Sequence, residues 1–509
     1  MKNLTREEYL DKMKGCWLGK CIGGSLGAPF EAHRNVQNLD YYTADLSGGM
    51  LPNDDLDLQL VWLNAAERFK TEITAEILSD YWLLGVIPNW AEYGVGKGNL
   101  RAGLLPPVSG KYNNRFKDSN GAWIRSEIWA CLAPGHPEIA VKYAYEDACV
   151  DHADEGVYSE VFTAALESAA FAESDKFKLI DIALSFIPDE CVTAKAVKRI
   201  VELYKSGLEW NDARIKIMNE YPSSFGGQLG YSEEGVVNGN WGFDAPNNVA
   251  LTLIGWLWAE DDFGRAICIT TMCGEDADCT AGTLAAILGI IMGAKNIPEK
   301  WSAPIGDEIA TICVSRFARG IKIPKTIDEL CKRVSNLMPS FMYGFVDILG
   351  NNSDFIAMND GDALFSVPAK AMNGSNGWDY RYFKNELPTG YTFRAKSMFY
   401  DCRVEAPKGI ELVSGEPLPL DLRIDNIAGF YSMPLYLEAR FITPEGVSIA
   451  GGANHSIFVN QLHCSNGRAE RTFEVIAENI TDPMVNIVLE LKVVSYATKI
   501  YVPITLIKK

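Results

Sequence analysis

The chain lacks any pair of cysteines in a Cys-x-x-Cys spacing, although it contains 12 cysteines in 509 residues. That absence excludes the commonest cysteine motifs of structural zinc sites and of thiol–disulfide oxidoreductases. Most of the cysteines lie in apolar stretches that predict helices, where buried free thiols are usually found. We therefore expect reduced thiols and a cytoplasmic location rather than a secreted disulfide scaffold.

The sequence also lacks long hydrophobic runs. No stretch reaches about 18 uninterrupted apolar residues, the length that a helix needs to cross a bilayer. The segment from Met1 to Lys14 is polar and has no apolar core of the kind that signal peptides carry. Both absences argue against a membrane or secreted protein.

An excess of positive charge is missing as well, because 47 lysines and arginines face 66 acidic residues and give a net charge of −19. This balance argues against nonspecific nucleic-acid binding and against a polybasic membrane anchor. We therefore expect neither a nucleic acid nor a membrane as partner. A local cationic site for an anionic substrate is still compatible with this charge. The sequence is compatible with a homo-oligomer and leaves the oligomeric state open.

Helical periodicity dominates the first two-thirds of the chain. Leu10, Met13 and Trp17 share one helix face, and residues 284–292 are apolar nearly all round, which predicts a central buried helix. Further helices are expected over residues 58–69, 138–149, 158–173, 194–204, 247–260, 262–273 and 280–294. We assign residues 1–345 to an all-α domain.

The pattern changes after about residue 345, where residues 346–385 include a stretch rich in Asn, Asp, Gly and Ser that predicts a connecting region. Residues 386–509 then show strand-like alternation, as in 435–441, 485–493 and 500–506, with Pro- and Gly-containing turns between. A chain of 509 residues is too long for a single ordinary core. The prediction is a multidomain protein, with the all-α domain followed by a C-terminal β-sandwich.

Two acidic clusters, far apart in sequence, each adjoin an apolar segment. The first is N-D-D-L-D at residues 53–57, and the second is E-D-A-D at residues 275–278. Ionised carboxylates beside a core are costly unless something compensates them, and hard divalent cations such as Mg²⁺ select oxygen ligands. The pair of clusters favours a binuclear metal site built from both halves of the domain.

Helix capping is the competing interpretation of both clusters. Asp54 and Asp55 adjoin a helix start, where negative charge is favoured, and Asp278 could cap the next apolar helix. Capping accounts for one acid of each cluster and leaves the others unexplained. Asp57 lies one turn from Asp54 and is a spare candidate for the site.

A glycine-rich segment at residues 15–31 ends in Glu31, which either projects into a site or is a solvated loop acid. Its glycines permit close helix packing or a tight turn. The segment also contains G-G-S-L-G at residues 23–27, a match to G-x-S-x-G. That pattern is meaningful only at a strand-to-helix elbow, and here a helical segment precedes it, so a Ser25 nucleophile is disfavoured.

Taken together, these motifs resemble the ADP-ribosylglycohydrolase family, the group that includes dinitrogenase-reductase-activating glycohydrolase. A-P-F-E at residues 28–31 is similar to the family's first motif, N-D-D-L at 53–56 to its T-D-D-T motif, and G-E-D-A-D-C at 274–279 to its G-G-D-T-D-T motif. N-G-A-W-I-R at 120–125 resembles its N-G-x-x-M-R segment, and D-H at 151–152 falls at its Thr-His pair. The order and spacing agree over roughly residues 8–345.

The resemblance implies a hydrolase of N- or O-glycosidic bonds in ADP-ribosyl or related ribosyl substrates, either small molecules or ADP-ribosylated proteins. It also implies two Mg²⁺ ions, with Mn²⁺ as an alternative. The implied metal ligands are Asn53, Asp54, Asp55, Asp276, Asp278 and Cys279. Catalytic roles fall to Glu31, Asp55 and Asp276, and substrate binding to Asn120, Gly121, Arg125 and His152. Arg125 is equally suited to a buried ion pair, and Trp241 and Phe243 to stacking on a base or sugar or to core packing.

Two departures from the family pattern concern the metal ligands. Asn53 and Cys279 replace threonines, and a thiol is a poor partner for a hard cation, which predicts a weaker second metal position. Two alternatives stay open: a hydrolase of the same fold acting on another small glycoside or nucleoside, and a non-catalytic ligand-binding homologue.

Overall fold

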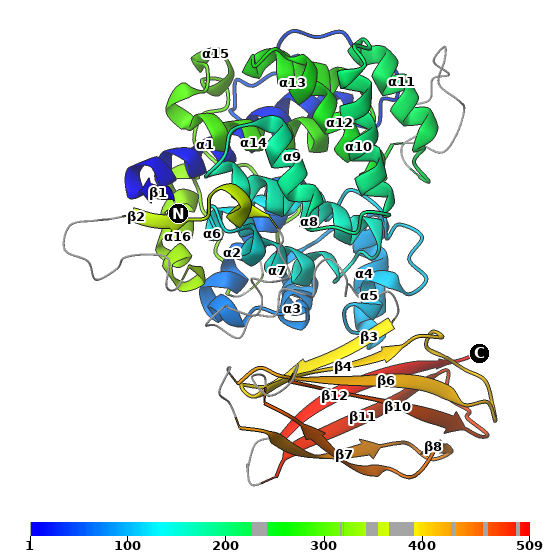
Figure 1. Cartoon of the computed structure of the whole chain (residues 1–509). Coiled ribbons are helices and arrows are strands. Elements are labelled where there is room, and N and C mark those ends of the chain that lie inside the picture. Colours follow the sequence, from blue (N-terminus) through cyan, green and yellow to red (C-terminus); the bar gives the residue numbers. More distant parts are fainter. Residues whose placement is uncertain are drawn as a thin grey trace. The chain divides into compact units, whose positions relative to one another are not determined.

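The computed structural model describes residues 2–225, 242–315, 318, 320–342, 355–365, 391–428, 433–461, 467–494 and 499–509 (Figure 1). The chain forms two compact units. One comprises Met1–Gly98 and Asn113–Ser366, and the other comprises Asn99–Tyr112 and Val367–Lys509. The first unit is helical and the second is built mainly of strands, which confirms the predicted fold class.

Every helix expected from the sequence is present, with ends that differ by a few residues. The helices are α1 (Arg6–Gly27), α2 (Asp54–Phe69), α3 (Ala75–Gly85), α4 (Ala91–Arg101), α5 (Val108–Lys111), α6 (Glu127–Leu132), α7 (Pro137–Ala148), α8 (Glu155–Ala170), α9 (Lys176–Leu184), α10 (Val192–Lys205), α11 (Trp210–Glu220), α12 (Ala245–Trp258), α13 (Phe263–Met272), α14 (Ala277–Met292), α15 (Glu299–Ser302) and α16 (Ile327–Phe341). Short 3₁₀ turns are η1 (Ala28–Phe30), η2 (Lys70–Glu72), η3 (Trp123–Arg125), η4 (Ala294–Asn296) and η5 (Gly361–Leu364). None of the helices in the described part of the chain combines the length and hydropathy needed to span a bilayer.

Helices α1 and α14 pack backbone against backbone. A Cβ atom added at Gly19 would lie 2.1 Å from the carbonyl oxygen of Ala285, and one added at Gly23 would lie 2.1 Å from that of Ala281. Glycines with higher numbers in α1 contact residues with lower numbers in α14, so the two helices are antiparallel. The end of α1 therefore lies beside the start of α14. The glycines recur every fourth residue and form one stripe on α1: Gly15, Gly19, Gly23 and Gly27.

Most of the predicted connecting region, 346–385, lies outside the described residues. Within it, β2 (Phe355–Met358) belongs to the helical unit and pairs antiparallel with β1 (Lys2–Thr5). The start of α1 next to β1 is fixed by a capping box, in which Thr5 and Glu8 exchange side chain to backbone hydrogen bonds.

The second unit contains two five-stranded sheets, with strand orders β3-β4-β6-β10-β8 and β5-β12-β11-β7-β9. Neighbouring strands are antiparallel, except that β5 runs parallel to β12. The strands are β3 (Tyr391–Lys396), β4 (Tyr400–Ala406), β5 (Glu411–Leu412), β6 (Leu418–Asn426), β7 (Leu435–Ile442), β8 (Val447–Ile449), β9 (Asn454–Val459), β10 (Arg468–Ala477), β11 (Met484–Val493) and β12 (Lys499–Lys508).

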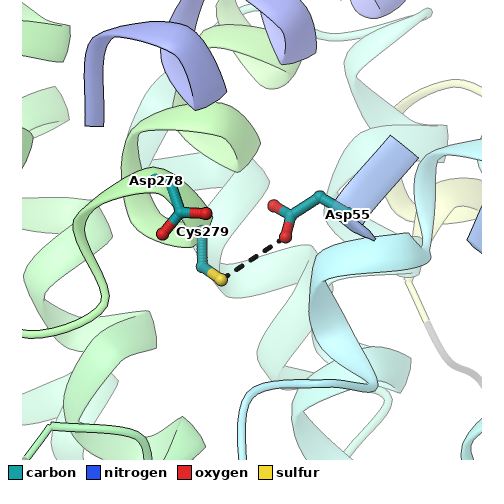
Figure 2. Close-up of side chains that lie close together, drawn as sticks. All are labelled: Asp55, Asp278 and Cys279. Carbon is teal, nitrogen blue, oxygen red and sulfur yellow. Dashed lines mark hydrogen bonds between the residues drawn. The ribbon is translucent and has the colours of Figure 1, made fainter. Parts of the chain in front are cut away.

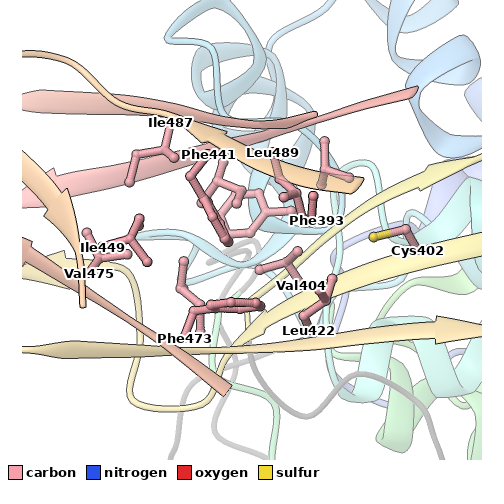
Figure 3. Close-up of a cluster of buried hydrophobic side chains, with 14 of the residues drawn as sticks. Phe393, Cys402, Val404, Leu422, Phe441, Ile449, Phe473, Val475, Ile487 and Leu489 are labelled. Atoms are coloured by element: carbon pink, nitrogen blue, oxygen red, sulfur yellow. The ribbon is translucent and has the colours of Figure 1, made fainter. Parts of the chain in front are cut away.

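Both sheets contribute to one apolar core, which makes this unit a β-sandwich. Along β7 buried and exposed residues alternate strictly, as the sequence pattern predicts. Figure 3 shows Val404 and Phe473 from one sheet facing the same interior as Phe441 and Leu489 from the other.

A segment distant in sequence, Asn99–Tyr112, completes the sandwich unit. Leu104 and Val108 are buried in the sandwich core, and the Thr505 hydroxyl donates to the Gly103 carbonyl at 3.3 Å. The sequence analysis placed this segment in the all-α domain, because nothing in its local pattern distinguishes it from the helices around it.

Gly19→Ala should destabilise the helical unit by about 1–3 kcal/mol, because the added methyl group would overlap the α14 backbone. Gly98→Ala is the matched control, since Gly98 is exposed in α4 and nothing lies within 4 Å of an added Cβ. The control should be neutral or slightly stabilising. Calorimetric melting of both variants tests this, and equal melting temperatures would contradict the backbone contact.

Candidate active site

Helix α2 begins at the first acidic cluster, and Asn53 rather than an aspartate is its N-cap. The Asn53 amide oxygen accepts a hydrogen bond from the Asp55 backbone N–H at 2.8 Å. Asp54 accepts from the Tyr93 hydroxyl at 2.8 Å. Asn53 therefore caps the helix, and the capping interpretation of Asp54 and Asp55 is wrong.

Helix α14 begins at the second cluster, with Asp276 at its N-cap position and no side-chain capping bond. Asp276 instead accepts from the Asn120 amide at 2.7 Å. Asp278, in the first turn, accepts from the Asn53 amide at 3.1 Å. Asn53 therefore connects the two clusters directly, although they lie more than 200 residues apart.

Glu31 reaches the same place because the chain after α1 is tied to the chain before α14. The Ala32 N–H donates to the Glu275 carbonyl at 2.9 Å, and the Glu275 N–H donates to the His33 carbonyl at 2.8 Å. This short antiparallel bridge follows η1, of which Glu31 is the C-cap. Glu31 is thereby held beside Asp276 and Asp278.

Two groups of side chains in the described part of the chain have ligand atoms within 4.8 Å of one another. One group is Glu31, Asp276 and Asp278, of which Glu31 is exposed and the aspartates are buried. The other is Asp55, Asp278 and Cys279, all buried, shown in Figure 2. Asp278 belongs to both groups, so the structure brings Asp55 of the first cluster together with Asp278 and Cys279. The predicted ligand Asp54 is in neither group.

The first group fits a hard divalent cation. It offers carboxylate oxygens only, and Asp278 Oδ1 is buried without a hydrogen-bond partner. Carboxylate oxygens are the ligands that Mg²⁺ and Mn²⁺ prefer. The second group fits less well, because the Cys279 thiol donates to Asp55 Oδ1 at 3.4 Å and offers sulfur in place of oxygen.

Crowding of acids raises the pKa values of these carboxyl groups. Desolvation, followed by the charges of Asp54 and Asp55, raises the pKa of Glu31 to about 7. Desolvation, followed by the charges of Glu31 and Asp54, raises the pKa of Asp278 to about 7. Desolvation also raises the pKa of Asp276 well above its usual range. Such acids ionise at neutral pH most readily when a cation accompanies them.

Lys20 lies behind the site and was missed by the sequence analysis. Its ammonium group is 3.1 Å from Asp55 Oδ2 and 2.9 Å from Glu127 Oε1, and its side chain is 2% exposed. Burial opposes its charge, but Asp55 and Glu127 outweigh that effect and raise the pKa of Lys20. The signal was available, since Lys20 is the one charged residue among residues 15–27.

The family model of ADP-ribosylglycohydrolase matches residues 5–338, which is more than half of the chain and includes every residue of both groups. The chain belongs to the ADP-ribosylglycohydrolase family. The resemblance of the motifs is thereby confirmed. No curated protein matches the chain. Among solved structures, it is similar to one described as "ADP-ribosylglycohydrolase-related protein complex", with 17% sequence identity and a TM-score of 0.39, over 66% of this chain and 98% of that chain.

The segment that resembles the family's N-G-x-x-M-R motif lies against the second cluster. Asn120 donates to Asp276 through its amide and accepts from the Trp123 indole at 2.8 Å, so both ends of its side chain are fixed. Gly121 leaves room for its neighbours, because an added Cβ would lie 2.3 Å from a Glu92 carboxyl oxygen. These contacts place Asn120 beside Asp276 and Gly121 against Glu92.

Arg125 is fully buried, and its guanidinium group bonds to other protein groups rather than facing the site. It donates to Asp147 at 2.9 Å, to Asp151 at 2.8 Å and 3.3 Å, and to the Gly121 carbonyl at 2.6 Å. Its guanidinium carbon lies 5.1 Å from the centre of the Trp82 ring. Of the two roles open for Arg125, the structure shows the buried ion pair.

His152 is also fully buried. Its Nδ1 lies 2.9 Å from Asp151 Oδ1, and its Nε2 hydrogen-bonds to the Ser119 hydroxyl at 2.9 Å. Burial opposes the charge of Asp151, but Arg125 and then His152 lower its pKa to about 2. His152 is thus enclosed by Asp151, Ser119 and Glu92, and the Glu92 carboxylate lies 4.0 Å from its Nε2.

Several other candidate residues lie away from the acidic groups or outside the described chain. Asp57 accepts from the backbone N–H groups of Ile312 and Cys313, at 2.7 and 2.6 Å, and so holds a loop. Ser25 is buried within α1, which is no nucleophile elbow, and accepts from the Leu51 N–H. Trp241 lies outside the described residues. Phe243 packs near Phe225, and its carbonyl accepts from the Asn120 N–H.

Arg125→Lys should destabilise the helical unit by roughly 3–5 kcal/mol, because Asp147 and Asp151 would lose most of their hydrogen bonds in a buried site. Arg115→Lys makes the same change at an exposed arginine and should have almost no effect. Thermal melting of both variants distinguishes them. A stable Arg125→Lys protein with weakened phosphate binding would contradict the structural role.

Metal-induced stabilisation should grow with pH. The raised carboxyl pKa values mean that the folded, metal-free protein binds protons more tightly than the unfolded chain, so its stability falls as the pH rises from about 4 to about 7. A divalent ion must displace those protons. The increase in melting temperature with Mn²⁺ should therefore be small near pH 5 and large near pH 8. Asp278→Asn should abolish the increase, and a pH-independent increase would contradict proton competition.

Proposed function

We propose that this chain is a metal-dependent hydrolase that cleaves an N- or O-glycosidic bond of an ADP-ribosyl or related ribosyl substrate. Membership of the ADP-ribosylglycohydrolase family supports the class of reaction. The observation that carries the proposal for this chain is the group of Glu31, Asp276 and Asp278. It joins one solvent-accessible carboxyl group to two buried ones within 4.8 Å.

A divalent cation, Mg²⁺ or Mn²⁺, would be held by Asp276, Asp278 and Glu31. When bound, it supplies Lewis-acid chemistry that polarises a water or a substrate hydroxyl. Asn53 and Asn120 keep the aspartates in position, since Asn53 donates a hydrogen bond to Asp278 and Asn120 donates one to Asp276. Such hydrogen bonds to ligating carboxylates fix their orientation.

Glu31 is suited to hold or release a proton during the reaction. Its pKa of about 7 is near that of an efficient general acid or base at neutral pH. Because Glu31 is exposed while Asp276 and Asp278 are buried, it lies on the side from which a substrate enters. Cleavage of a glycosidic bond through an oxocarbenium-like transition state uses paired carboxyl groups of this kind.

The substrate is proposed to be either a small molecule or an ADP-ribosylated protein. Asn120, which lies beside Asp276, and the adjoining Gly121 would contact its ribose. One observation favours a second candidate, a glycoside or nucleoside without phosphates. Arg125, whose guanidinium group could otherwise bind a phosphate, is paired with Asp147 and Asp151.

Incubation with peptides ADP-ribosylated on arginine or serine tests the first candidate. The protein with Mg²⁺ should release ADP-ribose, and EDTA should stop the release. Glu31→Gln should lower kcat by roughly 10²–10⁴-fold, the range expected for loss of an acid–base group. Glu299→Gln is the matched control at an exposed position of α15 and should leave kcat unchanged.

Each outcome of this assay separates the candidates. Release that persists in Asp276→Ala would contradict the proposed site. No release from either peptide, combined with hydrolysis of phosphate-free ribosides that ADP-ribose fails to inhibit, would favour the second candidate. Binding of ADP-ribose without turnover of any substrate would support a non-catalytic homologue.

A further inference from the structure

We propose that this chain binds one divalent ion rather than two, and that the buried ammonium group of Lys20 takes the charge-balancing place of the second ion beside Asp55. The inference rests on the metal dependence proposed above and concerns the number of ions. It differs from the binuclear site expected from the motifs. Three sets of contacts carry it.

The first set surrounds Lys20. Its ammonium group donates to the Ile124 carbonyl at 2.6 Å and to the Thr283 hydroxyl at 3.2 Å, and it pairs with Asp55 and Glu127 at 3.1 and 2.9 Å. A buried ammonium group is costly unless all its protons have partners. Here two hydrogen bonds and two ion pairs surround the ammonium group, so the positive charge is a permanent part of the site.

The second set of contacts concerns the space around Lys20, next to Gly282 of α14. A Cβ added at Gly282, one turn along α14 from Asp278, would lie 3.4 Å from Lys20 Cδ and 3.5 Å from Asp55 Oδ2. These are ordinary van der Waals distances, so the two side chains lie beside the part of α14 where Gly282 has no side chain. The 3.1 Å separation of Lys20 Nζ and Asp55 Oδ2 leaves no space between these two atoms for a hydrated ion, and Mg²⁺ usually keeps several of its waters.

The third set concerns the oxygens of Asp55. Oδ2 faces the Lys20 ammonium, and Oδ1 accepts from the Cys279 thiol, as Figure 2 shows. An ion at this position would have to compete with the thiol proton, accept sulfur as a ligand and lie near a positive charge. Each requirement opposes binding of a hard cation.

The group of Glu31, Asp276 and Asp278 has the opposite character. No lysine or arginine of the described chain forms an ion pair with these three carboxyl groups. Asp278 Oδ1 is buried and lacks a hydrogen-bond partner, and Asp278 is only 5% exposed. A single divalent ion in this group would coordinate that oxygen. It would also balance the negative charge of the three carboxyl groups, with which Lys20 forms no ion pair.

Counting bound Mn²⁺ by equilibrium dialysis and by the spin-resonance signal of free Mn²⁺ tests the proposal without any activity assay. The unaltered chain should bind one ion, and the double variant Lys20→Met, Cys279→Thr should bind two. Lys12→Met is the matched control. It lies on the same helix, and Lys12 donates to carbonyl groups of α14 without pairing with the site acids, so this variant should bind one ion.

Cobalt gives an independent readout of Cys279. The unaltered chain loaded with Co²⁺ should lack a thiolate-to-cobalt charge-transfer band, because the thiol keeps its proton. This measurement stands even where the double variant fails to fold.

Two Mn²⁺ ions of comparable affinity in the unaltered chain would overturn the inference and leave the proposed metal dependence intact. A thiolate band that accompanies a second Co²⁺ ion would do the same. Absence of any bound ion would overturn the inference together with the metal dependence, which separates the two kinds of failure.

Discussion

The contact between the backbones of α1 and α14 is the constraint on which the site depends. Because Gly15, Gly19, Gly23 and Gly27 of α1 face α14, the two helices approach more closely than side chains would allow. The antiparallel direction of that contact brings Glu31, which follows α1 and η1, to the start of α14, where Asp276 and Asp278 lie. A short backbone bridge between His33 and Glu275 then fixes the distance between the two segments. The exposed and buried carboxyl groups meet as a consequence of helix packing.

Around this contact, buried charges are arranged in two separate sets. One set places Lys20 between Asp55 and Glu127, directly behind the acids that a cation would bind. The other set places Arg125 between Asp147 and Asp151 and continues to His152. Buried ion pairs of this kind contribute little net stability but are costly to break. Their effect is to hold the first turn of α2 and the Asn120–Gly121 segment in one geometry, so that the carboxyl groups at the site cannot move apart to relieve their repulsion.

Burial, followed by the charges of neighbouring acids, raises the carboxyl pKa values in this geometry. Acids confined in a desolvated space favour their protonated forms until a cation arrives, which links proton release to metal binding. Glu31, with a pKa of about 7, is accessible to solvent and can exchange its proton at neutral pH. A chain that keeps an internal ammonium group beside Asp55 needs fewer external ions for charge balance. Under the proposal of a single ion, Lys20, which lies outside the ligand motifs, sets the number of ions that this site holds.

The sequence by itself determined the helical unit, the β-sandwich and the identity of the acidic clusters, because periodicity and local motifs depend on neighbours along the chain. It gave the positions of Asp276 and Asp278 and the family to which the chain belongs. Only the tertiary structure decided that Arg125 is buried between aspartates, that Asp57 holds the 312–313 loop, and that Asn99–Tyr112 joins the sandwich. It also revealed Lys20 behind Asp55. The physical reason is that burial and charge pairing join residues far apart in sequence, and no local pattern specifies which partner a charged side chain meets.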